Sequence, residues 1–133
     1  LYKETGIWSR LNEMTPEQTI DVSSEGDVVV VTLHQASIGA VGGVERIRET
    51  LRQVVRQQQP RHLVIDFSAV CFFSSQMLGL LVDMWRRMKD AGGGLLISGI
   101  NPQLNRVFRI THLDRLFEFY EDTDAAVAAL RVS

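Results

Sequence analysis

The sequence contains a single cysteine, Cys71, among 133 residues. One cysteine excludes a disulfide within the chain, so no disulfide framework can replace a hydrophobic core. Because Cys71 stands in the apolar run from Val70 to Phe73, we expect a buried thiol, since free cysteine behaves as a small hydrophobic side chain. The sequence therefore favours a reducing compartment.

Long apolar runs and an excess of basic residues are also absent. No stretch approaches the roughly 18 apolar residues that cross a bilayer, and the first residues lack the layout of a signal peptide. The net charge is −2 and 23% of residues are charged, which gives no basic footprint for nucleic acid. We expect a cytoplasmic protein with no direct membrane insertion and no nucleic acid partner.

The patterns of metal sites and of common catalytic sites are missing as well. The three histidines lie far apart, and none has ligand spacing with another histidine or with Cys71. The Gly-x-Ser-x-Gly motif of hydrolases is absent, and the glycines from Gly39 to Gly43 do not match a phosphate-binding loop. The sequence predicts no cofactor, no metal and no enzyme activity.

A small enzyme or nucleotide-binding domain stays a third interpretation, which a nucleotide-dependent rise in melting temperature would support.

The length and the 45% hydrophobic content suit one domain with one core. Segments 19–24 and 27–33 are rich in β-prone residues and flank Gly26, which predicts an opening hairpin. Apolar residues at helical spacing predict a helix from Val44 to Gln59, before Pro60. The branched run His62 to Phe67 predicts a central strand buried on both faces.

The second half continues the alternation of helices and strands. Segment 36–43 and segment 68–73 are predicted as loops. The later elements are a helix from Ser74 or Ser75 to about Lys89, a strand at 95–98, a helix at 102–110 capped by Asn101, an edge strand at 117–120 and a closing helix at 123–130. This order predicts an α/β fold: a mixed sheet of about five strands, opening with a hairpin and covered by about four helices. Residues 17–133 form this domain, and residues 1–16 form an arm or an extra helix.

The segment from Leu63 to Leu81 resembles the central strand, loop and helix start of the STAS domain of anti-sigma factor antagonists. In that family the strand ends in Asp, a small hydrophobic loop follows, and the helix opens with Asp-Ser-Ser/Thr-Gly-Leu-Gly. The first serine of this motif is the family's phosphorylation site. It aligns with Ser75, the preceding aspartate with Ser74, the following Ser/Thr with Gln76 and the glycine with Met77. The resemblance spans about Thr19 to Leu130.

The resemblance implies a protein-binding regulatory domain of transcription and signal transduction. Such a domain sequesters an anti-sigma factor of the serine-kinase type. It is released when Ser75 is phosphorylated, with Ser74 as the second candidate for the modified residue. A phosphatase is a further implied partner. Asp66 and Ser68 are expected to support the loop before the helix. The expected partner-binding residues lie at the start and along one face of that helix: Ser74, Ser75, Gln76, Leu78, Gly79, Val82 and Arg86.

Two departures from the family pattern support an alternative. Ser74 replaces the aspartate, and the segment His34 to Ser37 lacks the acidic residue that follows the family's second strand. Both acids would help to present the serine to a kinase. The alternative is a STAS scaffold module of a larger signalling or transport assembly, without phosphorylation, in which a serine only caps the helix.

The helix after Ser75 also allows two interpretations of its apolar residues. Helical spacing places Met77, Leu81, Met84 and Met88 on one stripe that should face the sheet. Leu78, Val82 and Trp85 lie to the side of that stripe. They either join an exposed patch with Ser75 or pack beneath a neighbouring helix.

Overall fold

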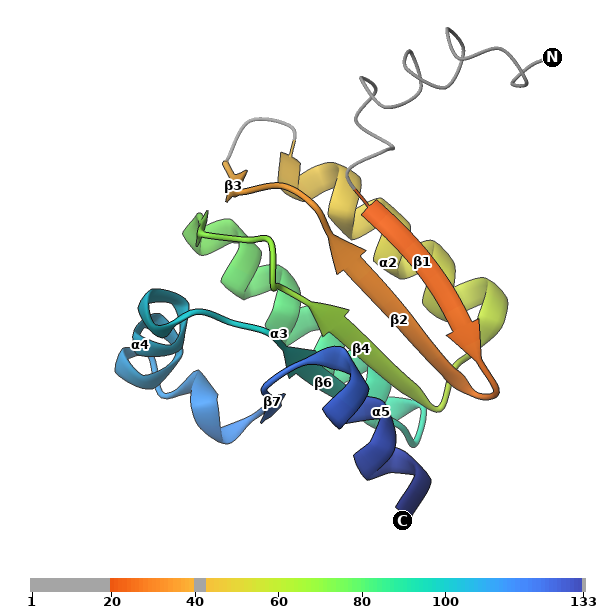
Figure 1. The fold of residues 1–133 in the computed structure, drawn as a ribbon. Coiled ribbons are helices and arrows are strands. Elements are labelled where there is room, and N and C mark those ends of the chain that lie inside the picture. The colour runs from red at the N-terminus through yellow and green to blue at the C-terminus, as the bar shows by residue number, and fades with distance from the viewer. Residues whose placement is uncertain (1–19, 40–42, 133) are drawn as a thin grey trace, which may run out of the picture.

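The computed structural model describes residues 20–39 and 43–132 (Figure 1). The arm or helix expected at residues 1–16 lies outside the described residues. Five strands form one mixed sheet in the order β1-β2-β4-β6-β7. The bounds are β1 Ile20–Glu25, β2 Val28–Leu33, β4 His62–Asp66, β6 Gly94–Ser98 and β7 Glu118–Tyr120. The predicted mixed sheet with an opening hairpin is confirmed.

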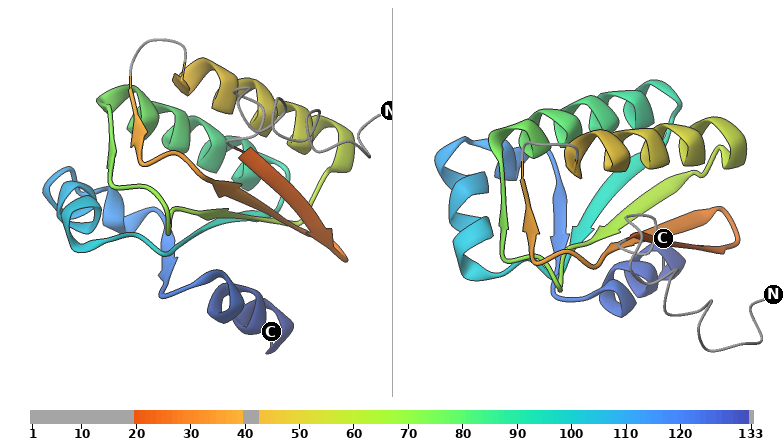
Figure 2. Two further views of the ribbon diagram at one scale, coloured as in Figure 1. Left: turned by 45° about the horizontal axis from the view of Figure 1, so that its top comes forward. Right: turned by 90° about the horizontal axis from the view of Figure 1, so that it is seen from above.

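The helices lie on both faces of this sheet (Figure 2). Helices α2 (Gly43–Gln58) and α3 (Ser75–Asp90) cover one face, and α5 (Thr123–Val132) covers the other. Helix α4 (Pro102–Ile110) and a short 3-10 helix, Leu113–Arg115, lie beside the β7 edge. None of the helices in the described ranges is both long and apolar enough to cross a bilayer.

The hairpin of β1 and β2 places alternate side chains on opposite faces. The strands are antiparallel, with Ile20 opposite Leu33, and Gly26 takes a positive φ of 65° in the turn. Because successive side chains of a strand alternate, Val29 and Val31 join the core under α2, whereas Val28 joins a smaller cluster under α5. Strand β1 is an edge, and every residue from Asp21 to Glu25 is exposed.

The centre of the sheet is parallel and largely buried. Val31, Ile65, Ile97 and Phe119 lie side by side across β2, β4, β6 and β7. Leu63, Val64 and Ile65 of β4 are each 0% exposed, as expected for a strand with helices over both faces. The predicted central strand is therefore confirmed.

Helix α3 presents its methionines to the sheet. Met77, Leu81, Met84 and Met88 are each 0% exposed, so the predicted stripe is confirmed. Beyond the C-terminus of α3, the backbone of Gly93 approaches that of Arg61, where a Cβ atom would lie 2.1 Å from the Arg61 carbonyl oxygen. Only glycine fits this close approach.

Two short strands were not predicted. Strand β3 (Ser37–Ile38) and strand β5 (Phe72–Phe73) form a separate parallel pair within segments predicted as loops. Two residues give no measurable periodicity, because a period-2 pattern needs four or more. Their pairing depends instead on a contact between segments more than 30 residues apart.

The expectation of a buried thiol is wrong, because Cys71 is exposed. Its neighbour Val70 is 2% exposed and Phe73 is 6% exposed, so these two residues supply the core contacts of the run. Cys71 and Phe72 between them point outward. An apolar run of four residues at the end of a loop cannot direct every side chain inward.

Candidate partner-binding site

The two adjacent serines at the start of α3 have different environments. Ser74 occupies the N-cap position with extended backbone angles (φ −81°, ψ 167°), and its carbonyl oxygen accepts a hydrogen bond from the Met77 N–H at 3.0 Å. Its side chain makes no capping hydrogen bond, and its Oγ is buried without a partner. Ser75 is the first residue of the helix, and its side chain is exposed. The Ser74 hydroxyl therefore does not cap α3.

The loop before α3 is held by a hydrogen-bond network at the ends of β4 and β6. Asp66 Oδ1 accepts from the Ser68 N–H at 2.8 Å, and Asp66 Oδ2 accepts from Thr123 Oγ1 at 3.0 Å. Thr123 Oγ1 is also 2.9 Å from Ser98 Oγ. Asp66 thus connects the loop to α5. Thr123 and Ser98 were not predicted in this role, because they lie 57 and 32 positions from Asp66 in the sequence.

Asn101 holds the same loop from the other side. Its Oδ1 accepts from the Leu104 N–H at 2.8 Å, which caps α4 as predicted. Its Nδ2 donates to the Val70 carbonyl oxygen at 3.2 Å. One side chain therefore joins the start of α4 to the segment that leads into Ser75. The cap was recognisable from the Asn-Pro pair, but the contact with Val70 was not.

The structure brings together part of the predicted patch on α3. Ser75, Gln76, Gly79 and Arg86 are exposed, and Ser75, Gly79 and Arg86 follow one another at helical spacing on the outer face. Leu78 and Val82 are half-buried and, like Trp85, pack against the core. These three residues therefore lie at the edge of the predicted patch and not at its centre.

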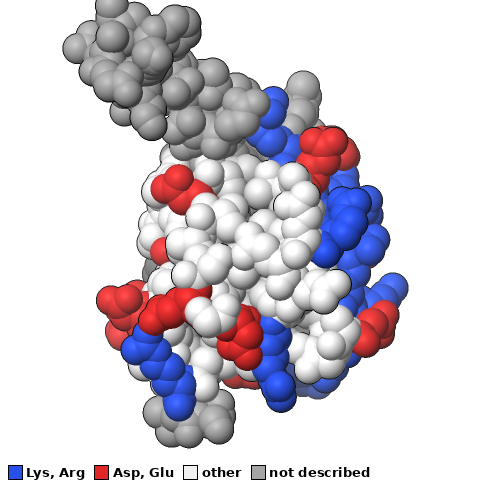
Figure 3. Space-filling model, turned by 90° about the vertical axis from the view of Figure 1, so that its right-hand side faces the viewer, with Lys and Arg blue, Asp and Glu red and all other residues white. Residues whose placement is uncertain are grey.

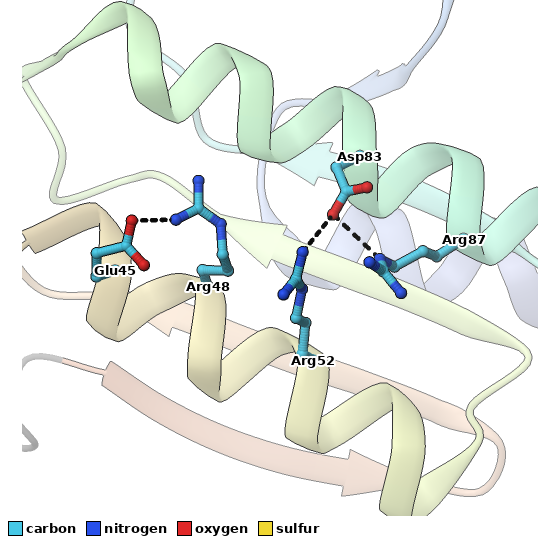
Figure 4. A network of polar contacts seen from close by, with 5 residues as sticks. All are labelled: Glu45, Arg48, Arg52, Asp83 and Arg87. Carbon is cyan, nitrogen blue, oxygen red and sulfur yellow. Dashed lines mark hydrogen bonds and ion pairs between the residues drawn. The ribbon is translucent and has the colours of Figure 1, made fainter.

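An acidic side chain joins the two helices behind this patch (Figure 4). Asp83 of α3 lies 3.0 Å from Arg87 of the same helix and 3.5 Å from Arg52 of α2. Partial burial acts to raise the pKa of Asp83, but the hydrogen bonds and charges of Arg87 and Arg52 outweigh it, so the pKa is lowered. On α2, Glu45 is paired with Arg48. Of these contacts, the pair of Asp83 and Arg52 joins α3 to α2, and the others lie within one helix.

Charge is unevenly distributed around the molecule. Helices α2 and α3 carry seven Arg and Lys against four Asp and Glu, although the chain as a whole is net negative. Figure 3 shows basic side chains gathered along one side, over α2, next to a broad uncharged area.

The STAS domain family model matches residues 19–126. An anti-sigma F factor antagonist of Paenibacillus polymyxa is 20% identical over 88 residues, which is 66% of this chain and 75% of that protein. The family match covers all five strands of the sheet and the candidate site.

Solved structures agree with this family. An anti-sigma-factor antagonist (STAS) domain protein from Planctomyces limnophilus is 28% identical, with a TM-score of 0.74 over 84% of this chain and 97% of that chain. The Bacillus cell fate determinant SpoIIAA in its phosphorylated form is 18% identical, with a TM-score of 0.66 over 84% and 98%, and this likeness shows the fold alone. The family model spans most of the chain, and the sheet order and helices described above agree with it. The chain therefore belongs to the STAS domain family.

Proposed function

We propose that this domain is a cytoplasmic anti-sigma factor antagonist, a regulator without enzyme activity of its own. It binds an anti-sigma factor of the serine-kinase type through the exposed start of α3 and is released when Ser75 is phosphorylated. The observation that carries this proposal is the position of Ser75. It is exposed at the first residue of a 16-residue helix, where the family's phosphorylated serine aligns.

The chemistry at Ser75 suits a phosphate acceptor. Within residues 20–39 and 43–132, the Ser75 hydroxyl has no hydrogen bond to a base that could activate it as a nucleophile. A phosphate at the first helical residue lies near unpaired backbone N–H groups and the positive end of the helix dipole. Phosphorylation therefore needs no refolding of α3.

The same phosphate would oppose docking of a partner. It adds about −1.5 to −2 charge units at the centre of the surface, and that charge loses hydration when a partner covers it. A kinase-type anti-sigma factor would thus release the domain by modifying it. A phosphatase would restore the binding form.

The test measures binding and modification together. Kinase-type anti-sigma factors from the source organism are purified, and their affinity for wild type, Ser75→Ala and Ser75→Glu is measured by calorimetry. We expect Ser75→Ala to bind about as well as wild type and Ser75→Glu to bind at least about tenfold more weakly, because the added carboxylate is desolvated. Ser74→Ala is the matched control, since it removes the neighbouring hydroxyl and leaves Ser75 in place.

Peptide mass spectrometry on protein from growing and stressed cells then locates the phosphate. Phosphate on Ser75 that changes with condition supports the switch. Binding without phosphate in any condition would reject the release step and favour the scaffold module. That alternative is supported by Ser74 in place of the family's aspartate and by the absence of an acidic residue from His34 to Ser37. Failure of every anti-sigma factor to bind would reject the antagonist function.

A further inference from the structure

One large apolar side chain lies on the surface beside Ser75. Phe72 is 58% exposed, although the adjacent Phe73 is 6% exposed. The two residues form β5, where successive side chains point to opposite sides. Phe73 meets Phe67 and Phe108 edge to face, at centroid distances of 5.8 and 5.9 Å. Phe73 therefore belongs to the core, and Phe72 is left in solvent.

The backbone that carries Phe72 is held in place by its neighbours. The N–H groups of Cys71 and Phe72 donate to the Ala36 carbonyl oxygen at 2.7 and 3.1 Å, and the Ser74 N–H donates to the Ile38 carbonyl oxygen at 3.0 Å. The Asn101 side chain holds Val70, as described above. Because this backbone is already held, binding at Phe72 needs to order only the side chain, which lowers the entropy cost of association.

The segments that carry Phe72 and lie next to it in the fold have few charged groups. In the segment before β3, His34 is exposed and pairs with Asp21 of β1. The exposed residues from there to Gly39, at β5 and in the first turns of α3 are neutral: Ala36, Ser37, Gly39, Cys71, Phe72, Ser75, Gln76 and Gly79. The buried centres of protein interfaces are depleted in charged residues and enriched in aromatic ones. This composition therefore matches the centre of a protein interface and not its rim.

We infer that Phe72 is the apolar anchor of this interface, and that the anti-sigma factor receives its ring in an uncharged, apolar pocket. This inference rests on the proposed function and adds the chemistry that the partner must present. It also explains why one phosphate suffices for release. Ser75 lies three residues from the anchor, so its phosphate would have to enter the uncharged region that closes around the ring.

The test uses the purified anti-sigma factor that binds the wild-type chain. We expect Phe72→Ala to weaken binding about thirtyfold or more, as for truncation of an aromatic hot spot, and Phe72→Leu to retain most of the affinity. Ile110→Ala is the matched control, because Ile110 is 70% exposed at the end of α4 and belongs to none of the segments around Phe72. It should change the affinity less than about twofold. Thermal unfolding of each variant confirms that it is folded.

Each other outcome contradicts the inference in a distinguishable way. If Phe72→Ala binds like wild type while Ser75→Glu does not, Phe72 is not the anchor and the proposed function stands. Equal losses for Phe72→Ala and Ile110→Ala would show a general effect of apolar area. If Phe72→Ala abolishes self-association and leaves anti-sigma factor binding unchanged, the ring serves a second copy of this chain. If no anti-sigma factor binds the wild type, the inference and the proposed function both fail.

Discussion

At the scale of single residues, the two serines at the start of α3 show how burial separates identical side chains. The Ser74 hydroxyl is buried without a partner, whereas Ser75 is exposed. A buried hydroxyl without a hydrogen bond keeps its desolvation cost. Ser74 therefore contributes less to stability than a serine at an N-cap usually does, and of the two hydroxyls only that of Ser75 is exposed to solvent.

The N-caps of α3 and α4 should accordingly respond differently to alanine. Ser74→Ala removes no capping hydrogen bond and one unpaired hydroxyl, so we expect the free energy of unfolding to change by less than about 0.5 kcal/mol. Asn101→Ala removes the cap of α4 and the contact with Val70, and we expect a loss of about 1–2 kcal/mol. Urea denaturation of both variants measures the difference. Equal destabilisation by the two substitutions would contradict the unpaired state of Ser74.

At the scale of elements, α2 and α3 lie side by side on the sheet and are joined across their outer surfaces by Asp83. A carboxylate with a lowered pKa stabilises the fold at pH values above its unfolded pKa, and this contribution is lost as the pH falls through the lowered folded pKa. Asp83 is 37% exposed, so solvent screening keeps the contribution small. The ion pair therefore contributes little to overall stability.

We therefore expect Asp83→Asn to lower the free energy of unfolding by up to about 1 kcal/mol at pH 7. The difference from wild type should persist down to the ordinary Asp value of 3.8 and shrink below it, as the wild-type carboxylate becomes protonated. Urea denaturation between pH 7 and pH 2.5 measures this difference. Glu49→Gln, an exposed substitution on α2, is the control and should show no such loss near pH 3.8. A constant difference over the whole range would mean that the charge of Asp83 is not involved.

At the scale of the whole molecule, the long elements were predictable and the contacts between distant segments were not. The branched run of β4 and the Asn101-Pro102 start of α4 carry strong local signals, and both elements begin where predicted. The pair of β3 and β5 has only two residues on each strand, and the bond from Thr123 to Asp66 joins residues 57 positions apart. Such contacts follow from the packed sheet and leave no periodic pattern.

The candidate site also contains features that were predictable from the sequence and features that were not. The segment around Ser75 was singled out by its resemblance to the family motif, and helical spacing predicted the exposed positions Gly79 and Arg86. The exposure of Phe72 was missed, because the apolar run that contains it was interpreted as buried. Which member of an apolar pair faces solvent depends on strand pairing, which the sequence does not display.

The sheet order also predicts how stability is distributed over the molecule. Strand β4 lies between β2 and β6 under helices on both faces, whereas β1 is an edge strand with exposed side chains. Amides in buried central strands open only in near-global unfolding, and edges open locally. We expect β4 amides to exchange with deuterium at least about a hundredfold more slowly than those of β1. Hydrogen exchange followed by mass spectrometry measures both peptides, and equal protection would contradict this distribution.

The exposure of Phe72, Ser75, Gln76 and Gly79 has a consequence for how such a domain can diverge. Exposed side chains contribute little to folding, so most substitutions at these positions are nearly neutral for stability. The buried methionines of α3 and the β4 strand have no such freedom. Mutation can therefore change the proposed recognition surface one residue at a time while the scaffold remains intact, and duplicated copies of such a domain could acquire separate partners.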